Sequence, residues 1–169
     1  MQGDNNASFR MTATISWTFH LKWVKSMVSP PIYGRGRASY NIIGGELGVR
    51  ALVERFYDLM ETTQDYQTLF SLHPHDIVTT KVELSRFLIA WMGGARSYHL
   101  VYGPINIPTA HAHLNVTQAL VDNWLSCMYE ALTQLGYSLE FSTYLINQLA
   151  ITAERIRCAS QYRRLATKD

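Results

Sequence analysis

The sequence predicts an all-α domain, and three observations support this prediction. Apolar residues recur every three or four positions in four segments of residues 42–169, the spacing that gathers them on one helix face. Glycines follow several of these segments, where helices commonly end. The region shows this helical period rather than the period of two that is typical of strands.

Size, charge and composition restrict the class of protein. The chain has 169 residues, of which 47% are hydrophobic, so one domain can bury roughly two-thirds of its surface. Residues 1–41 carry a net charge of +4, which leaves −2 for residues 42–169, and a slightly acidic body argues against nucleic-acid binding. No run of eighteen apolar residues predicts a transmembrane segment. We expect Cys127 and Cys158 to be reduced and buried, as in a cytoplasmic protein.

Residues 1–41 differ from the rest of the chain. Apolar and polar residues alternate with a period of two over residues 15–23, and the prolines and glycines of residues 29–39 indicate a linker. We therefore expect residues 1–41 to be an appended or poorly structured extension, followed by one domain at 42–169.

The first predicted helix follows Gly44-Gly45. Its inward face is expected to hold six residues at helical spacing: Val49, Leu52, Val53, Phe56, Tyr57 and Met60. A buried tyrosine hydroxyl needs a hydrogen-bond partner, and for Tyr57 a backbone carbonyl would be the ordinary one.

A second helix is predicted after the connector LHPHD at 72–76. Thr79 or Thr80 can cap it, with Glu83 completing a capping box if the cap is Thr80. The inward residues have helical spacing, and Gly93-Gly94 should end the helix. They are Leu84, Phe87, Leu88 and Trp91.

Two further helices are predicted after an irregular loop at 95–109. The third carries an apolar stripe that ends at Gly136 as a C-terminal cap. Its residues are Leu120, Trp124, Cys127, Met128, Ala131 and Leu135. The last helix should run from about Leu139 to Leu165, with four residues inward. They are Leu145, Leu149, Ala153 and Ile156.

Histidines are the main candidates for chemistry. Two His-x-His pairs, His73/His75 and His111/His113, could together chelate zinc or copper, although neither lies in a strand pattern. Motifs for nucleotide binding or serine hydrolysis are absent from the sequence. The alternative is one axial histidine facing an apolar cavity between helices, the arrangement that haem requires.

Four stretches decide in favour of haem. GGELGVRALVERFYDLM (44–60), LHPHD (72–76), RFLIAWMGGARSY (86–98) and WLSCM (124–128) resemble, in order and near-family spacing, the truncated haemoglobins of group II, the O type. The resemblance covers about residues 43–165. It implies a two-over-two helical sandwich that binds haem b.

The resemblance also implies a role for individual residues. His111, thirteen residues before Trp124, matches the proximal iron ligand. Tyr57, His73 and Trp124 match polar distal positions. Further positions match residues that contact or gate the haem. Glu83 stands where the family often has a basic residue that pairs with a haem propionate, so Arg96 and Tyr98 are expected to take that role. The full set of haem-contacting positions is Thr80, Leu84, Phe87, Leu88, Arg96, Tyr98 and Met128.

The implied function is reversible dioxygen binding at a pentacoordinate iron. Hydrogen bonds from the three distal residues would slow oxygen release, which suits nitric oxide dioxygenase or peroxidase activity supported by a reductase. NO and CO would be further ligands, and the protein could be a monomer or a homodimer. Two alternatives are a non-haem metal site built by His73, His75, His111 and His113 and a helical interaction module without a cofactor.

Overall fold

Four long helices form the body of the protein in the computed structural model. They are α3 (Gly45–Thr62), α5 (Ile77–Trp91), α8 (Gln118–Gln134) and α9 (Leu139–Ala166). Shorter elements lie between them: α2 (Ala38–Ile42), the 3-10 turn η1 (Gln64–Tyr66), α4 (Gln67–Phe70) and α7 (Ile107–His111). The structure describes residues 32–73, 76–95, 100–101, 103 and 106–166, and within them it is all-helical. No helix in these ranges is long and apolar enough to cross a membrane.

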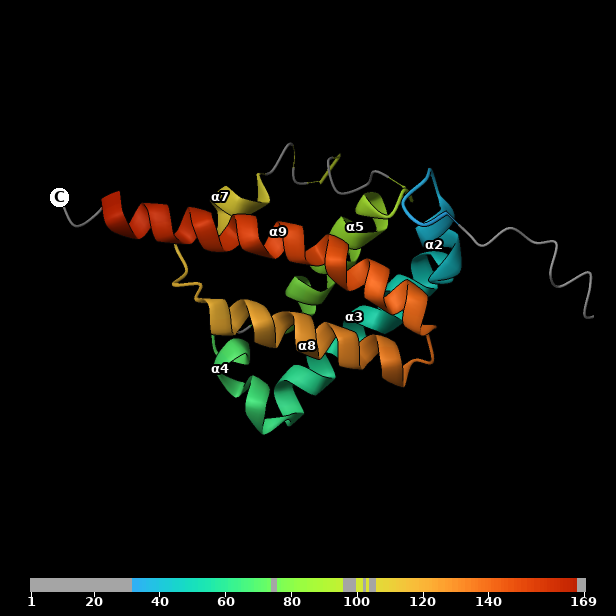
Figure 1. Ribbon diagram of the computed structural model, residues 1–169, viewed down its shortest axis with the longest axis horizontal. Coiled ribbons are helices and arrows are strands. Elements are labelled where there is room, and N and C mark those ends of the chain that lie inside the picture. The colour runs from blue at the N-terminus through green and yellow to red at the C-terminus, as the bar shows by residue number, and fades with distance from the viewer. Residues whose placement is uncertain (1–31, 74–75, 96–99, 102, 104–105, 167–169) are drawn as a thin grey trace, which may run out of the picture. The chain divides into compact units, whose positions relative to one another are not determined.

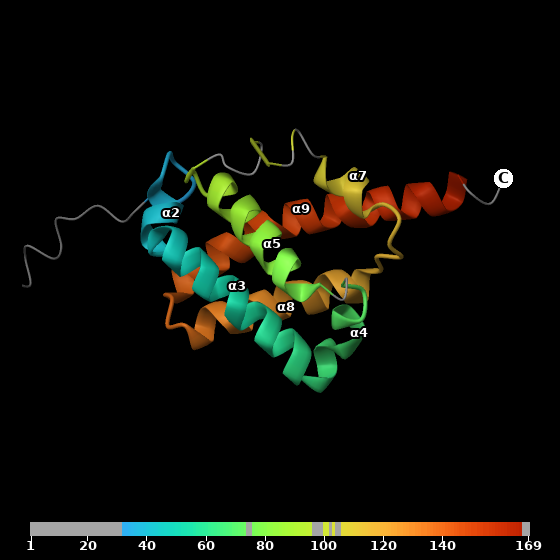
Figure 2. The same ribbon diagram turned by 180° about the vertical axis from the view of Figure 1, so that it is seen from behind.

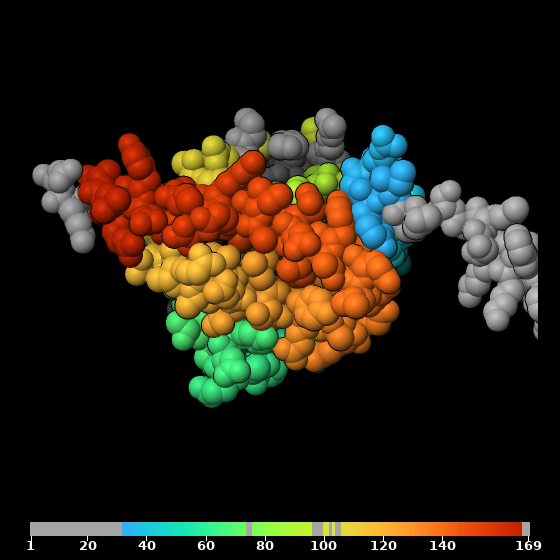
Figure 3. Space-filling view, viewed as in Figure 1, coloured from blue at the N-terminus to red at the C-terminus, as the bar shows by residue number. Residues whose placement is uncertain are grey.

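The long helices pack as two pairs. α3 lies against α5, and α8 lies against α9, which returns after a short turn (Figures 1 and 2). α3 also packs on α8, so the two pairs share one core, while the short α7 packs on α9. Figure 3 shows that α9 and α8 together cover one face of the described unit. The layered arrangement leaves the short segments α4 and α7 at its margins.

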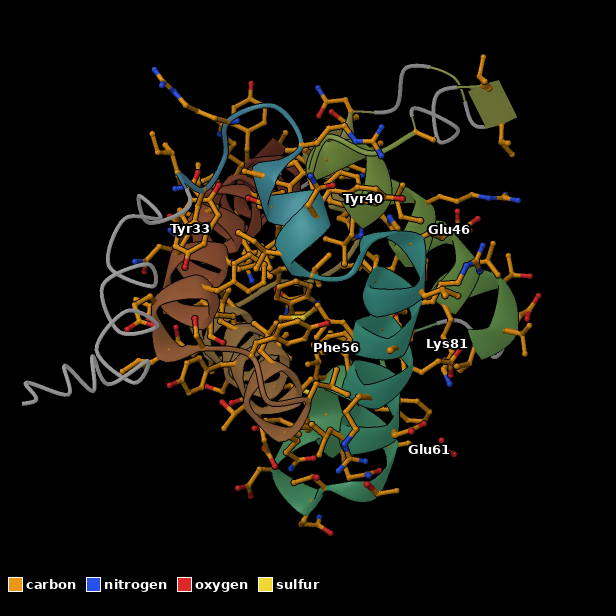
Figure 4. The ribbon with its side chains drawn as sticks, turned by 90° about the vertical axis from the view of Figure 1, so that its right-hand side faces the viewer. Tyr33, Tyr40, Glu46, Phe56, Glu61 and Lys81 are labelled. Carbon is orange, nitrogen blue, oxygen red and sulfur yellow. The ribbon has the colours of Figure 1, made fainter. Side chains whose placement is uncertain are left out.

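The first predicted helix is confirmed by α3. All six residues of its expected inward face are buried, and Phe56 points from α3 into the interior (Figure 4). Lys81 on α5 donates to Glu54 on α3 at 2.5 Å and lies 3.8 Å from Asp58, which links the two helices at their exposed edge.

The expected cap of the second helix is wrong. α5 begins at Ile77, and the side chain of Asp76 accepts a hydrogen bond from the Thr79 N–H at 3.1 Å. An aspartate three residues before Thr79 reaches this free N–H directly, so the helix starts earlier than the threonines suggest. Thr80 lies inside the helix and donates its hydroxyl to the Asp76 carbonyl at 2.9 Å.

Residues 32–41 belong to the compact unit, which begins at Ile32 and not at the expected boundary of 42. The Tyr33 ring, labelled in Figure 4, belongs to this segment. It stacks on Tyr144 of α9, with ring centroids 5.0 Å apart. Gly93, which ends α5 with a φ of 92°, lies so close to this segment that a Cβ there would be 2.1 Å from the Gly36 carbonyl oxygen. This close approach explains why the helix end needs glycine and why the boundary is earlier. Residues 1–31 lie outside the described part.

Local capping fixes the ends of α7 and α8. The Asn106 side chain accepts from the Thr109 N–H at 3.2 Å, and Pro108 lies in the first turn of α7, where its missing N–H is not needed. The Thr117 hydroxyl accepts from the Leu120 N–H at the start of α8. Gly136, with a φ of 78°, follows the end of α8 as predicted.

Ser160 of α9 holds the segment between α7 and α8. Its hydroxyl accepts from the Val116 N–H at 3.0 Å and donates to the Leu114 carbonyl. Arg164, one turn further along, donates to the Asn115 side chain at 2.5 Å. Because the side chains of Leu114 and Val116 both line the cavity described below, α9 fixes one of its walls.

The prediction that both cysteines are buried is only half right. Both are free thiols, but Cys127 is buried beside the Phe56 carbonyl whereas Cys158 is exposed. Cys158 lies on α9 beyond Leu149, the last buried apolar residue of that helix, where the turns no longer cross the core. Its thiol contacts Glu154 one turn back, at 3.4 Å from the carboxylate.

Replacing Ser160 with alanine should lower the free energy of unfolding by about 1–3 kcal/mol, because the Val116 N–H loses its acceptor. Ser142 on the same helix is a matched control, since it is equally buried and its hydroxyl has no partner among the described residues. Ser142→Ala should be neutral or stabilising. Urea unfolding of the two variants tests this, and equal losses would contradict the role of Ser160.

The two thiols should react very differently with a disulfide reagent at pH 8. Burial raises the pKa of Cys127 to about 12, so almost none of it is thiolate at that pH. We expect one rapidly reacting thiol in the native chain and two in denaturant. The native reaction should disappear in Cys158→Ser and persist in Cys127→Ser, and rapid reaction of native Cys158→Ser would contradict the burial of Cys127.

Candidate functional site

A cavity of about 370 Å³ lies between the helices. Every element from α3 to α9 except η1 lines it, including the segment that joins α7 to α8. The lining is mostly apolar, with a few polar groups. The lining residues are Tyr57, Leu69, Leu72, His73, Thr80, Glu83, Leu84, Phe87, Ile107, Ala110, His111, His113, Leu114, Val116, Leu120, Val121, Trp124, Leu149, Thr152, Ala153 and Ile156.

His111, the last residue of α7, has a fixed ring orientation. Its Nδ1 lies 2.8 Å from the Ile107 carbonyl oxygen, one helical turn back. A carbonyl oxygen only accepts, so Nδ1 must carry the hydrogen and Nε2 keeps its lone pair in the neutral ring. A backbone carbonyl on one ring nitrogen is the usual support for a metal-ligating histidine, so His111 is ready to bind a metal through Nε2.

His73, just after α4, has the same arrangement. Its Nδ1 lies 3.0 Å from the Leu69 carbonyl oxygen, which assigns the hydrogen to Nδ1 and a lone pair to Nε2. Burial lowers the pKa of His73, and the charge of a protonated His111 would lower it further. His73 is therefore neutral at pH 7, and its Nε2 accepts rather than donates. The donor role expected of His73 would require a hydrogen on Nε2, which the neutral ring with its hydrogen on Nδ1 does not have.

The two histidines approach the cavity from different elements. α4 and α7 lie apart in both ribbon views, on either side of α8 and α9 (Figures 1 and 2). His113 also lines the cavity, but it is exposed, and its Nδ1 pairs with the Ala110 carbonyl at 2.9 Å.

Tyr57 presents a hydroxyl to this cavity. The side chain is only 3% exposed, and its ring meets the His73 ring edge-on at 5.3 Å between centroids. Burial, and secondarily the charge of Glu83, raises the pKa of Tyr57 well above its ordinary value, so the hydroxyl stays protonated. No described residue pairs with this hydroxyl, in contrast to the carbonyl bond that an ordinary core tyrosine would make.

Trp124 and Thr80 complete the polar lining expected from the sequence. The Trp124 ring packs edge-on against Phe56 at 5.3 Å, and no described group accepts from its indole N–H. Thr80 lines the cavity, although its hydroxyl hydrogen is used on the Asp76 carbonyl. Tyr57 and Trp124 are thus two neutral donors that the described lining residues offer to a bound molecule.

The other predicted contact residues separate into three groups. Leu84 and Phe87 line the cavity, whereas Leu88 and Met128 are completely buried in the core and do not reach it. Helical spacing places all of these on inward faces, but only the packing of the other helices decides which of them meet core and which meet the cavity. Arg96 and Tyr98 lie outside the described residues.

Sequence reasoning missed several lining residues, of which three show why. The segment after His111 contributes Leu114 and Val116, and α9 contributes Thr152. No periodicity marks the first two, because they follow a helix end. Thr152 precedes Ala153, which the helical pattern did place inward, so a wider inward stripe on α9 would have included it.

The four-histidine metal hypothesis gains no geometric support. Among the described residues, no group of three or more histidine, cysteine, aspartate or glutamate side chains is placed to hold a metal ion. His75 lies outside those residues. The alternative is a single axial imidazole that holds a metal carried by a larger cofactor, and the free Nε2 of His111 is compatible with it.

Known proteins resemble this chain in sequence and in structure. Residues 38–157 match the sequence profile of the family described as bacterial-like globin. A group 2 truncated haemoglobin of Bacillus subtilis is 30% identical over 119 residues, which cover 70% of this chain and 87% of that protein.

Two solved structures show the same likeness. A cold-adapted truncated haemoglobin from the Antarctic marine bacterium Pseudoalteromonas haloplanktis superposes with a TM-score of 0.67 and 27% identity, over 70% of this chain and 95% of that one. A truncated oxygen-avid haemoglobin from Bacillus subtilis gives a TM-score of 0.63 and 28% identity, over 70% and 97% of the two chains. The all-helical fold is that of the two-over-two globins, and the chain belongs to the bacterial-like globin family, among the group II truncated haemoglobins.

Proposed function

We propose that the protein binds haem b through His111 Nε2 and binds dioxygen reversibly at an otherwise pentacoordinate iron. The observation that carries this proposal is the cavity of about 370 Å³ with an imidazole Nε2 free in its lining. Packed interiors leave few voids larger than a water molecule, so an apolar cavity of this size favours a large apolar guest over an empty helical module. Membership of the globin family supports haem as that guest.

When bound, haem would supply an iron that binds small gases and changes between ferrous and ferric states. The chain supplies the surroundings. Phe87 and Leu84 offer apolar surface for a flat ring, and Tyr57 and Trp124 offer donors to a ligand that gains negative charge. The high pKa of Tyr57 keeps its donor proton in place throughout the physiological pH range.

These donors favour slow oxygen release. A hydrogen bond to a charged group contributes about 1.5–3 kcal/mol, so each of the two donors can slow release by roughly ten- to a hundredfold. Slow release suits redox turnover, such as oxidation of nitric oxide or reduction of peroxide, better than oxygen delivery. We propose that a separate reductase supplies electrons, and that NO and CO occupy the same position. The oxygen avidity of the similar Bacillus subtilis protein is consistent with this view.

Replacing His111 with alanine should abolish the pentacoordinate ferrous spectrum, because the cavity loses the half-buried imidazole whose Nε2 is proposed to hold the iron. His113→Ala is the matched control: His113 lines the same cavity and makes the same kind of Nδ1 bond, but it is exposed. Visible spectra of the two dithionite-reduced proteins distinguish the ligands. Loss of the spectrum in His113→Ala with retention in His111→Ala would overturn the assignment.

Trp124→Phe should raise the dioxygen dissociation rate by about ten- to a hundredfold, because phenylalanine keeps most of the ring surface and removes the N–H donor. Stopped-flow displacement of oxygen by CO measures the rate. Tyr129→Phe, a conservative change on an exposed residue of the same helix, should leave the rate unchanged. A wild-type rate in Trp124→Phe would exclude the indole from stabilising the ligand.

A further inference from the structure

His73 gives the cavity a proton acceptor. The bond from Nδ1–H to the Leu69 carbonyl, 3.0 Å long, leaves only the Nε2 lone pair to face a bound molecule. The carbonyl belongs to the turn of α4 that directly precedes His73, so the ring cannot change tautomer without losing this bond.

The accepting His73 ring lies beside a hydrogen-bond donor, Tyr57. The Tyr57 ring packs edge-on against the His73 ring at 90° between planes, and the Tyr57 hydroxyl lines the same cavity. Dioxygen and CO carry no proton and use only the donor. A ligand that arrives with a proton to lose, such as hydrogen peroxide, uses both groups.

We propose that His73 is the proton acceptor of this site and selects protic ligands, hydrogen peroxide foremost, a role that rests on the haem function proposed above. One O–H bond of HOOH breaks, a bond from Nε2 to that proton forms, and the electron pair stays on oxygen to give the hydroperoxide anion. The step needs no oxidant or reductant. It supplies the anion as the species that binds metal, while Tyr57 donates to it.

Other groups in the cavity fit this role less well. Tyr57 and the Trp124 indole act as donors, and the Thr80 hydroxyl hydrogen is bonded to the Asp76 carbonyl. His113 is exposed to solvent. Glu83 is the other base in the lining, and its carboxylate is therefore the competitor that an experiment has to exclude.

Cyanide association with the ferric full-length protein tests the proposal. At neutral pH cyanide is present almost entirely as HCN, so it must lose a proton to bind, as hydrogen peroxide does. General base catalysis contributes about 10²–10⁴-fold, so His73→Phe should slow association of both HCN and peroxide at least a hundredfold. CO association with the ferrous protein needs no proton transfer and should change less than threefold.

Three variants serve as controls. His73→Asn can keep a donor to the Leu69 carbonyl without a proton-accepting nitrogen, so it should be as slow as His73→Phe. Tyr129→Phe changes an exposed residue that does not line the cavity and should leave all rates unchanged. Glu83→Gln should also leave the association rate of HCN within threefold.

The outcomes separate this inference from the proposed function. HCN association at the wild-type rate in both His73 variants would overturn the role of His73, and so would slow HCN association in Glu83→Gln alone. Normal CO binding in these variants would still support the haem assignment. Faster HCN association in His73→Phe, together with a low-spin wild-type spectrum, would show that His73 itself ligates the iron. That result would also overturn the role of His73 as proton acceptor. A wild-type chain that binds neither haem nor CO would overturn both proposals.

Discussion

The central constraint of the structure is that its helices pack on one core without filling the space beside it. α3, α5, α8 and α9 share one apolar core, and beside it they leave about 370 Å³ unfilled. Core burial of Phe56, Met128 and Leu145 holds the helices together, while Ser160 fixes the loop that forms one wall. Packed interiors leave few spaces of this size, so the apolar cavity favours occupation by a ligand and connects the packing to the proposed function.

The chemistry of the site follows from two backbone carbonyls. The Ile107 and Leu69 carbonyls each accept from the Nδ1 of a histidine four residues later, and each therefore turns a lone pair on Nε2 toward a ligand. The same local geometry serves two purposes. In the proposed function His111 holds a metal, while half-buried, neutral His73 takes a proton, with the Tyr57 hydroxyl as the donor beside it.

Much of the fold could be predicted from the sequence, because helical spacing is a local signal that tertiary packing preserved. The inward face of α3 and the glycine ends of α5 and α8 are where the periodicity placed them. The start of α5 at Asp76 was missed because three neighbouring residues can cap, and only the structure shows which one does. Exposure of Cys158 was missed because α9 continues past the core with an unbroken helical pattern.

The lining of the site was predictable in part, because helical spacing shows which residues face inward. The resemblance placed His111 and Trp124 in the cavity by position, but an inward-facing residue such as Leu88 can meet the core instead. Ring tautomers have no sequence signal, so the tautomer of His73 required the geometry. The most direct test of the haem assignment is the visible spectrum of the purified chain, supplied with haemin, after dithionite and then CO. We expect a Soret band that shifts on CO binding, and a chain that stays colourless with added haemin would contradict the assignment.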